Sequence, residues 1–305
     1  MTTAVLSVLA VLLSGPVPSV LARVPALRRA PRAAMTLWQA VALAAVLSAL
    51  GAGLSLVTGT ALGPAWYGVA LTALLLTSMV LARLLLSGHR VGTRVRAARR
   101  RHREAVDVLA TPHTVTGDAA SREAGTGHGL RVLDHDAPVA YCVPGLARSR
   151  VVVSAGTLGQ LAPEELAAVL AHEHAHLRAR HDLVLEAFTV LHEAFPRVVS
   201  SGSALREVRL LVEVLADRAA RRTHGRLPLA RALVSLADSH PPAATLGAGG
   251  AGLVERIELL RDERPHRVLA AVLYAAAAAV VVLPTVFVAF PWLAGLGVWG
   301  GVPGV

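Results

Sequence analysis

The chain has 305 residues, of which 54% are hydrophobic and only 16% are charged. This composition excludes an ordinary soluble protein and indicates a membrane protein with one soluble domain. The formal net charge is +10, but the arginines that carry it cluster beside apolar runs, so we expect no direct nucleic-acid binding. The chain has a single cysteine, Cys142, which excludes an intrachain disulfide.

Four apolar runs come close to or exceed the roughly 20 residues that a helix needs to cross a bilayer. These runs are Ala4–Leu21, Met35–Val57, Pro64–Leu86 and Val268–Leu293. The first run contains Pro16 and Pro18, so we expect it to be kinked. We do not expect it to be a signal peptide, because its arginines follow the apolar residues instead of preceding them.

The arginines alternate along the chain in a way that predicts the topology. They are frequent after the first run (Arg23 to Arg32) and after the third (Arg90 to Arg103), and absent from the second connection and from the tail. Because short cytoplasmic loops are enriched in basic residues, the N-terminus is expected outside and the region from about 87 to 266 inside. With an Ala- and Gly-rich composition that suggests a high-GC genome, this predicts a multi-pass protein of the bacterial cytoplasmic membrane.

The soluble region is about the size of one domain. A basic juxtamembrane helix, Arg94–Leu109, and a polar loop, Thr111–Gly129, are predicted to lead into it. The predicted organisation is therefore three transmembrane helices with a basic cytoplasmic loop at 1–87, the juxtamembrane helix and loop at 88–129, the soluble domain at 130–266, and a fourth transmembrane helix with a short extracellular tail at 267–305.

Within the soluble domain, strand-like runs precede helical ones. The predicted strands are Leu130–Asp134, Ala137–Val143 and Arg150–Ser154, separated by turn residues. Helical spacing then runs from Pro163 through Val190, and further helices are expected at 204–222, 227–239 and 254–264. The expected fold is an α-helical integral membrane protein with a cytoplasmic α+β domain that contains a small β-sheet.

The run His172-Glu173-His174-Ala175-His176 contains an HExxH motif. On a helix, His172 and His176 lie one turn apart on one face, where two imidazoles can bind one Zn²⁺. Glu173 points about 100° away from His172 around the helix, so it suits a general base that takes a proton from the attacking water better than a ligand.

A catalytic zinc site needs a third protein ligand. A histidine six residues after His176 would supply it in one known pattern, but position 182 is Asp. The alternative is Glu213, which lies in an apolar stretch where an unpaired carboxylate is costly to bury. Asp217 follows one turn later and can accept a hydrogen bond from a ligating imidazole. The competing interpretation is that these two acids are solvated and form ion pairs with nearby arginines.

HExxH followed by ExxxD resembles the BlaR/MecR-type membrane zinc metallopeptidases over about Leu130–Arg222. This gluzincin site pattern is shared with HtpX-like and CAAX-prenyl-protease-like membrane enzymes. The resemblance implies one Zn²⁺ per chain, with Glu173 as the base, Asp217 hydrogen-bonded to a ligand, and the ligands His172, His176 and Glu213. It also implies an edge strand that pairs with an extended substrate, formed by Arg150, Val151, Val152, Val153 and Ser154.

The sequence departs from this family at two places. The family often has an acid five residues after the second histidine, where this chain has His181 followed by Asp182. Sensor members carry an extracellular ligand-binding domain after the last span, whereas here only about a dozen uncharged residues follow it. We therefore expect this chain to lack the extracellular sensor domain.

The resulting hypothesis is a zinc metalloendopeptidase that cuts a cytoplasmic or membrane-proximal protein in regulatory proteolysis. By analogy alone, the substrate is a winged-helix repressor. One alternative is an HtpX-like quality-control protease, which would cut many sites. Another is a non-catalytic zinc-binding scaffold or signalling protein, in which Glu173 would have no task.

Overall fold

The computed structural model describes residues 2–57, 64–112, 129–145, 149–196, 200–237, 250–262 and 264–295. The uncharged second connection, most of the predicted polar loop and Pro/Gly-rich linker, and the tail beyond residue 295 lie outside these ranges. The described chain forms two compact units. The first contains Met1–His89, Phe188–Val208 and His266–Val305, and the second contains Arg90–Ala187 and Arg209–Pro265. The sequence-based domain limits stay a prediction, and the units differ from them in grouping Phe188–Val208 with the apolar helices.

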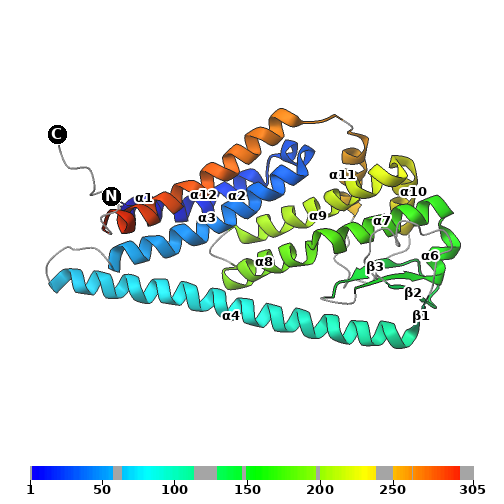
Figure 1. The fold of residues 1–305 in the computed structure, drawn as a ribbon, viewed down its shortest axis with the longest axis horizontal. Coiled ribbons are helices and arrows are strands. Elements are labelled where there is room, and N and C mark those ends of the chain that lie inside the picture. The colour runs from blue at the N-terminus through cyan, green and yellow to red at the C-terminus, as the bar shows by residue number, and fades with distance from the viewer. Residues whose placement is uncertain are drawn as a thin grey trace. The chain divides into compact units, whose positions relative to one another are not determined.

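The first unit is built from long apolar helices (Figure 1). It contains α1 (Thr2–Ser14), α2 (Pro16–Leu21), the short 3-10 helix η1 (Pro25–Arg29), α3 (Pro31–Val57), the first part of α4 (Pro64–Leu109) and α12 (Arg267–Gly295). Helix α3 packs against both α1 and α12. Four helices of the described chain are long and apolar enough to cross a membrane, as predicted. The predicted kink in the first is confirmed, because α1 and α2 separate at Gly15, directly before a proline.

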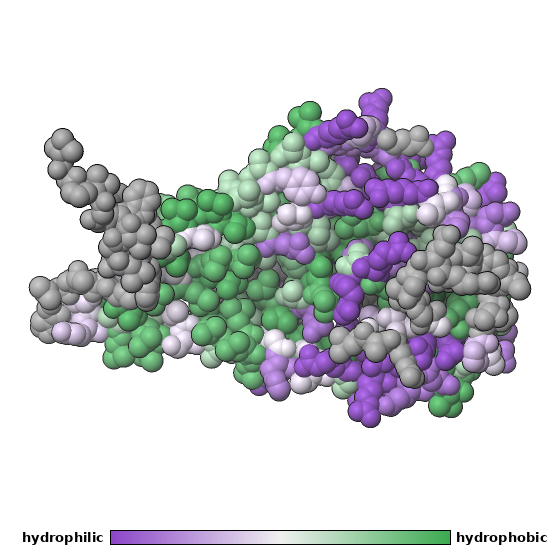
Figure 2. Space-filling view, viewed as in Figure 1, coloured by the Kyte–Doolittle hydropathy of each residue, from purple (hydrophilic) through white to green (hydrophobic). Residues whose placement is uncertain are grey.

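The outward side chains of these helices are those of a lipid-facing surface. On α4, Leu71, Leu75 and Leu85 are each more than half exposed. Hydrophobic side chains cover much of the visible face of the first unit, whereas hydrophilic ones gather over the second (Figure 2). Helix α4 continues without interruption to Leu109, so it contains both the third predicted span and the predicted juxtamembrane helix. The arginine-rich segment has no proline to end the helix.

The second unit contains a small mixed sheet. Its strands β1 (Ala110–Pro112), β2 (Gly129–Leu133), β3 (Ala140–Val143) and β4 (Arg150–Ser154) have the order β1-β2-β4-β3. Strand β4 pairs in parallel with β2 and antiparallel with β3. The three predicted strands are therefore present within a few residues of their predicted limits, and β1 is an addition at the end of the basic helix.

The prediction that Arg150–Ser154 forms the edge strand is wrong. Strand β4 lies between two partners, and all five of its residues are buried. Val152 packs with Val106 of α4 and Tyr141 on one face of the sheet, and helix α7 (Pro163–Ala179) contacts β4 as well. A strand that is covered on both faces has a continuous run of apolar residues, and Val151-Val152-Val153 is such a run.

The described residues form five more helices: α6 (Ala155–Gln160), α8 (His181–Ala194), α9 (Ser201–His224), α10 (Arg226–Ala237) and α11 (Gly250–Arg261). In the second unit a core cluster joins α7, α9, α10 and α11 through Ala168, Ala220, Leu229 and Leu260. These contacts place α9 and α11 beside the HExxH helix.

The helix predicted to run from Pro163 through Val190 is interrupted at one residue. Arg180 adopts the left-handed conformation, with φ 51° and ψ 43°, and ends α7. Its N–H donates to the carbonyls of His176 and Leu177, which satisfies groups that the helix end leaves free. His181 then begins α8, so the chain turns sharply directly after the HExxH segment.

The first turn of α6 requires a glycine. A Cβ on Gly156 would lie 1.8 Å from the carbonyl oxygen of Asp136. We expect Gly156→Ala to lower the free energy of unfolding by about 1–3 kcal/mol, because the backbone must move to relieve the clash. Gly159 is the control on the same helix, since a Cβ there meets nothing within 4 Å, and Gly159→Ala should be neutral or stabilising by about 0.5–1 kcal/mol. Thermal unfolding of both variants checks this, and equal melting temperatures would contradict it.

Candidate metal centre

Helix α7 carries the two histidines of the motif. It begins with Pro163 at its first turn, and the Glu165 carboxylate accepts a hydrogen bond from the Ala162 N–H, which caps the helix. His172 is buried and His176 is half-buried. Their Nε2 atoms lie 3.1 Å apart, so both imidazoles converge on one point.

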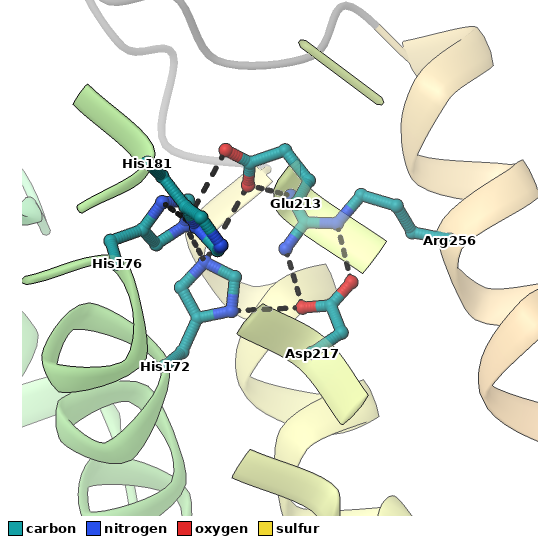
Figure 3. A network of polar contacts seen from close by, with 6 residues as sticks. All are labelled: His172, His176, His181, Glu213, Asp217 and Arg256. Carbon is teal, nitrogen blue, oxygen red and sulfur yellow. Dashed lines mark hydrogen bonds and ion pairs between the residues drawn. The ribbon is translucent and has the colours of Figure 1, made fainter. Parts of the chain in front are cut away.

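Helix α9 brings a carboxylate to the same point. Oε2 of Glu213 lies 3.5 Å from Nε2 of His172, and Oε1 lies 3.6 Å from Nε2 of His176. Figure 3 shows the three side chains converging from the two helices. The sequence predicted this group of three, and the structure brings it together in the second unit.

The geometry of this group fits a zinc ion. Ligand atoms about 2.0–2.1 Å from a tetrahedral zinc lie about 3.3–3.4 Å from one another. The two imidazole nitrogens lie 3.1 Å apart, and each lies 3.5–3.6 Å from one of the two Glu213 oxygens, which is close to that value. Two imidazole nitrogens and one carboxylate oxygen are also the donors of a catalytic zinc site, which leaves a fourth position open. His172, His176 and Glu213 are therefore suited to hold one zinc ion.

A buried ion-pair network holds two of these side chains. Nδ1 of His172 lies 2.9 Å from Oδ1 of Asp217, which is 1% exposed. Arg256 of α11 donates two hydrogen bonds of 2.7 Å to the same carboxylate, and its Nη1 lies 3.1 Å from Oε2 of Glu213. Asp217 thus has the predicted contact with a ligand, and Arg256 balances both acids. The competing interpretation, in which the two acids are solvated, is wrong for Asp217.

The ionisable side chains of the site shift one another's pKa values. Burial lowers the pKa of His172, but its hydrogen bonds to Asp217 and Glu213 outweigh burial and raise the pKa to about 10. Burial and the charge on His172 lower the pKa of His176 to about 3. Burial raises the pKa of Glu213, but the contacts with His172 and Arg256 prevail and lower it to about 2. These shifts favour the charged form of His172 and the ionised form of Glu213. A divalent cation bound by these side chains would displace the proton of His172.

Glu173 also lies on α7, but it is not one of the three candidate metal ligands. Burial raises the pKa of the Cys142 thiol of β3, and the charge of Glu173 raises it further. Burial is the main cause that raises the pKa of Glu173 above its ordinary value. A carboxylate beside the ligands with a raised pKa has the properties of a general base.

Sequence analysis did not identify Arg256 or Cys142 as a neighbour of the site. Arg256 lies far along the chain in a short helix, and only its charge within an apolar pattern distinguishes it. No sequence signal connects Cys142 with the site. His181 was noted only as a departure from the family pattern, and its Nδ1 lies 3.1 Å from Nδ1 of His176.

Comparison with known proteins gives one family match. Residues 112–199 match Peptidase family M48, a range that includes the HExxH motif and ends before Glu213. No curated protein matches the chain significantly. Among solved structures, the crystal structure of S. mikatae Ste24p is similar at 16% identity and a TM-score of 0.37, with 64% of this chain and 65% of that chain covered. The chain spans less than two thirds of the length of that structure. Residues 112–199 are thus similar to Peptidase family M48, and they lie in a membrane-type helical protein whose His172, His176 and Glu213 can hold a metal ion.

Proposed function

We propose that this protein is a membrane-embedded zinc metalloendopeptidase of the gluzincin type. The observation that carries the proposal is the juxtaposition of His172, His176 and Glu213, at separations suited to zinc, with Glu173 on the same helix. The match of residues 112–199 to Peptidase family M48 supports it. A purely structural zinc site would not need a half-buried carboxylate next to its ligands.

The chain's own groups have separate tasks in peptide hydrolysis. Glu173 takes the proton of the attacking water and gives it to the leaving amine. Asp217 accepts a hydrogen bond from Nδ1 of His172 and so leaves Nε2 free to bind a metal. Zinc held by His172, His176 and Glu213 would supply a Lewis acid that polarises the carbonyl and lowers the pKa of water.

Strand β3 is the proposed partner of an extended substrate, in place of the buried β4. Among the described strands, β3 pairs only with β4, so its other edge can accept a further strand. Helix α7, which carries the proposed base, contacts β3, which supports this choice of strand. A peptide paired with β3 through main-chain hydrogen bonds would pass beside the metal.

The proposed substrate is a cytoplasmic or membrane-proximal protein cut in regulatory proteolysis. The narrower form of this proposal, a winged-helix repressor, rests on the family resemblance alone. The arginine distribution supports a cytoplasmic location of the second unit in a bacterial membrane. Labelling of new N-termini in membranes with added enzyme discriminates between roles: one cleaved site indicates a regulatory enzyme, and many sites in damaged proteins indicate quality control.

Metal removal tests the function directly. We expect about one zinc per chain in detergent-purified protein and loss of casein cleavage after treatment with 1,10-phenanthroline, because the ligand set has the donors of a catalytic site. Adding one equivalent of zinc should restore cleavage, and the non-chelating 1,7-isomer should have no effect. Bound zinc without cleavage of casein or of a peptide library would contradict the proposal in favour of a scaffold.

A further inference from the structure

We propose that His181 is a positioning residue that fixes the tautomer and orientation of the ligand His176. The inference rests on the proposed function, because it assigns a task at the same metal site. It starts from the two nitrogens of His176. Nε2 faces the Nε2 atom of His172 and a Glu213 oxygen, so it is the nitrogen available to a metal. Nδ1 lies 3.1 Å from Nδ1 of His181.

A neutral imidazole that binds a metal through Nε2 must carry its proton on Nδ1. That proton needs an acceptor, because a buried donor without a partner costs about 1–3 kcal/mol. For His172 the acceptor is the Asp217 carboxylate. For His176 the residue at hydrogen-bonding distance is His181, whose Nδ1 accepts when its own proton is on Nε2. The two ligands are thus matched, each with one nitrogen towards the metal position and one held by a partner.

The backbone places His181 for this contact. The left-handed Arg180 ends α7, and His181 is the first residue of α8. This turn brings the side chain of residue 181 back over His176, with the two rings edge-on at a centroid separation of 4.9 Å and an interplanar angle of 87°. His181 is 6% exposed, so water does not replace it easily as the acceptor. Figure 3 shows its ring pointing towards His176.

The chemical nature of residue 181 affects the strength of this contact. An imidazole nitrogen can perform for His176 the accepting task that the Asp217 carboxylate is placed to perform for His172. A carboxylate acceptor forms a stronger, charge-assisted hydrogen bond. His181 is therefore a neutral acceptor at a place where a carboxylate could stand. Its hydrogen bond with His176 is weaker than a bond between Asp217 and His172.

Two substitutions separate hydrogen bonding from packing. His181→Leu keeps apolar bulk and removes the acceptor, whereas His181→Asp keeps an acceptor and loses bulk. We measure the zinc dissociation constant by competition with a chromophoric chelator, the visible spectrum of the cobalt-substituted protein, and the melting temperature of the metal-free protein. The wild type and His174→Ala, which changes a histidine elsewhere on the same helix, are the references.

We expect His181→Leu to weaken zinc binding by about 10–100-fold and to alter the cobalt spectrum, and His181→Asp to bind zinc at least as tightly as the wild type. The reverse order, with His181→Leu tight and His181→Asp weak, would show a packing role and overturn the inference, as would equal affinity in all variants. If a substitution greatly lowers the melting temperature of the metal-free protein, His181→Asn takes its place. The zinc affinity of His181→Asn must then resemble that of His181→Asp. Failure of the proposed function is separate, because it would appear as absent zinc or absent peptidase activity in the wild type itself.

Discussion

Glu173→Gln is expected to lower peptidase activity by about 10³-fold, within the range that general acid–base catalysis contributes, and to leave about one zinc per chain bound. Glutamine has nearly the shape of glutamate but cannot accept a proton from water at neutral pH. The three ligand atoms belong to His172, His176 and Glu213, so the change does not touch the metal position. Initial rates on a quenched fluorescent peptide, together with zinc content, measure both effects.

The matched control is His174→Gln, which changes the neighbouring residue on α7 and leaves Glu173 in place. It should keep most of the activity and the zinc. Loss of zinc in Glu173→Gln would mean that the glutamate has a structural task. Retained activity with zinc bound would remove Glu173 from the chemistry and favour a different base.

Arg256→Met is expected to lower the free energy of unfolding by about 3–5 kcal/mol, because it leaves a buried carboxylate without its counter-charge. Asp217 is 1% exposed and receives both 2.7 Å hydrogen bonds from this guanidinium. Methionine fills similar space without charge. For a unit of this size the loss corresponds to a fall of about 10 °C in melting temperature, which differential scanning fluorimetry in detergent can detect.

The control for this effect is the double variant Arg256→Met with Asp217→Asn. Asparagine keeps an oxygen that can accept from His172 and removes the uncompensated charge. We expect it to recover more than half of the lost stability, which a double-mutant cycle expresses as a coupling energy between the two positions. Additive losses in the double variant would show that Arg256 stabilises the protein through packing alone.

The sequence was sufficient for the elements with strong periodic signals. Each of these signals depends on neighbours within a few residues. They are the apolar runs, the start of α7 at Pro163, and the one-turn spacing of His172 and His176. Glu213 could be found because a carboxylate in an apolar helical run is costly unless a partner binds it. Local patterns of this kind lead directly to a helix, and a helix fixes which side chains share a face.

The contacts that sequence reasoning missed depend on long-range pairing. Strand order is not determined by the strands themselves, although the run Val151-Val152-Val153 was a sign that β4 is covered on both faces. The break at Arg180 has no sequence signal, since a left-handed residue is usually glycine or asparagine. Arg256 and Cys142 reach the site only through tertiary packing, and the residues next to them in the chain give no indication of that packing.

The order of synthesis gives the Arg256 contact a further consequence. A ribosome makes both histidines, Glu213 and Asp217 first, and the guanidinium that balances the two acids is added 39 residues after Asp217. Helix α11, which carries it, directly precedes the last apolar helix of the described chain. Burial of Asp217 is unfavourable until that arginine is present. The metal centre is therefore completed only after α11 has been synthesised, later than all of the helices that carry its ligands.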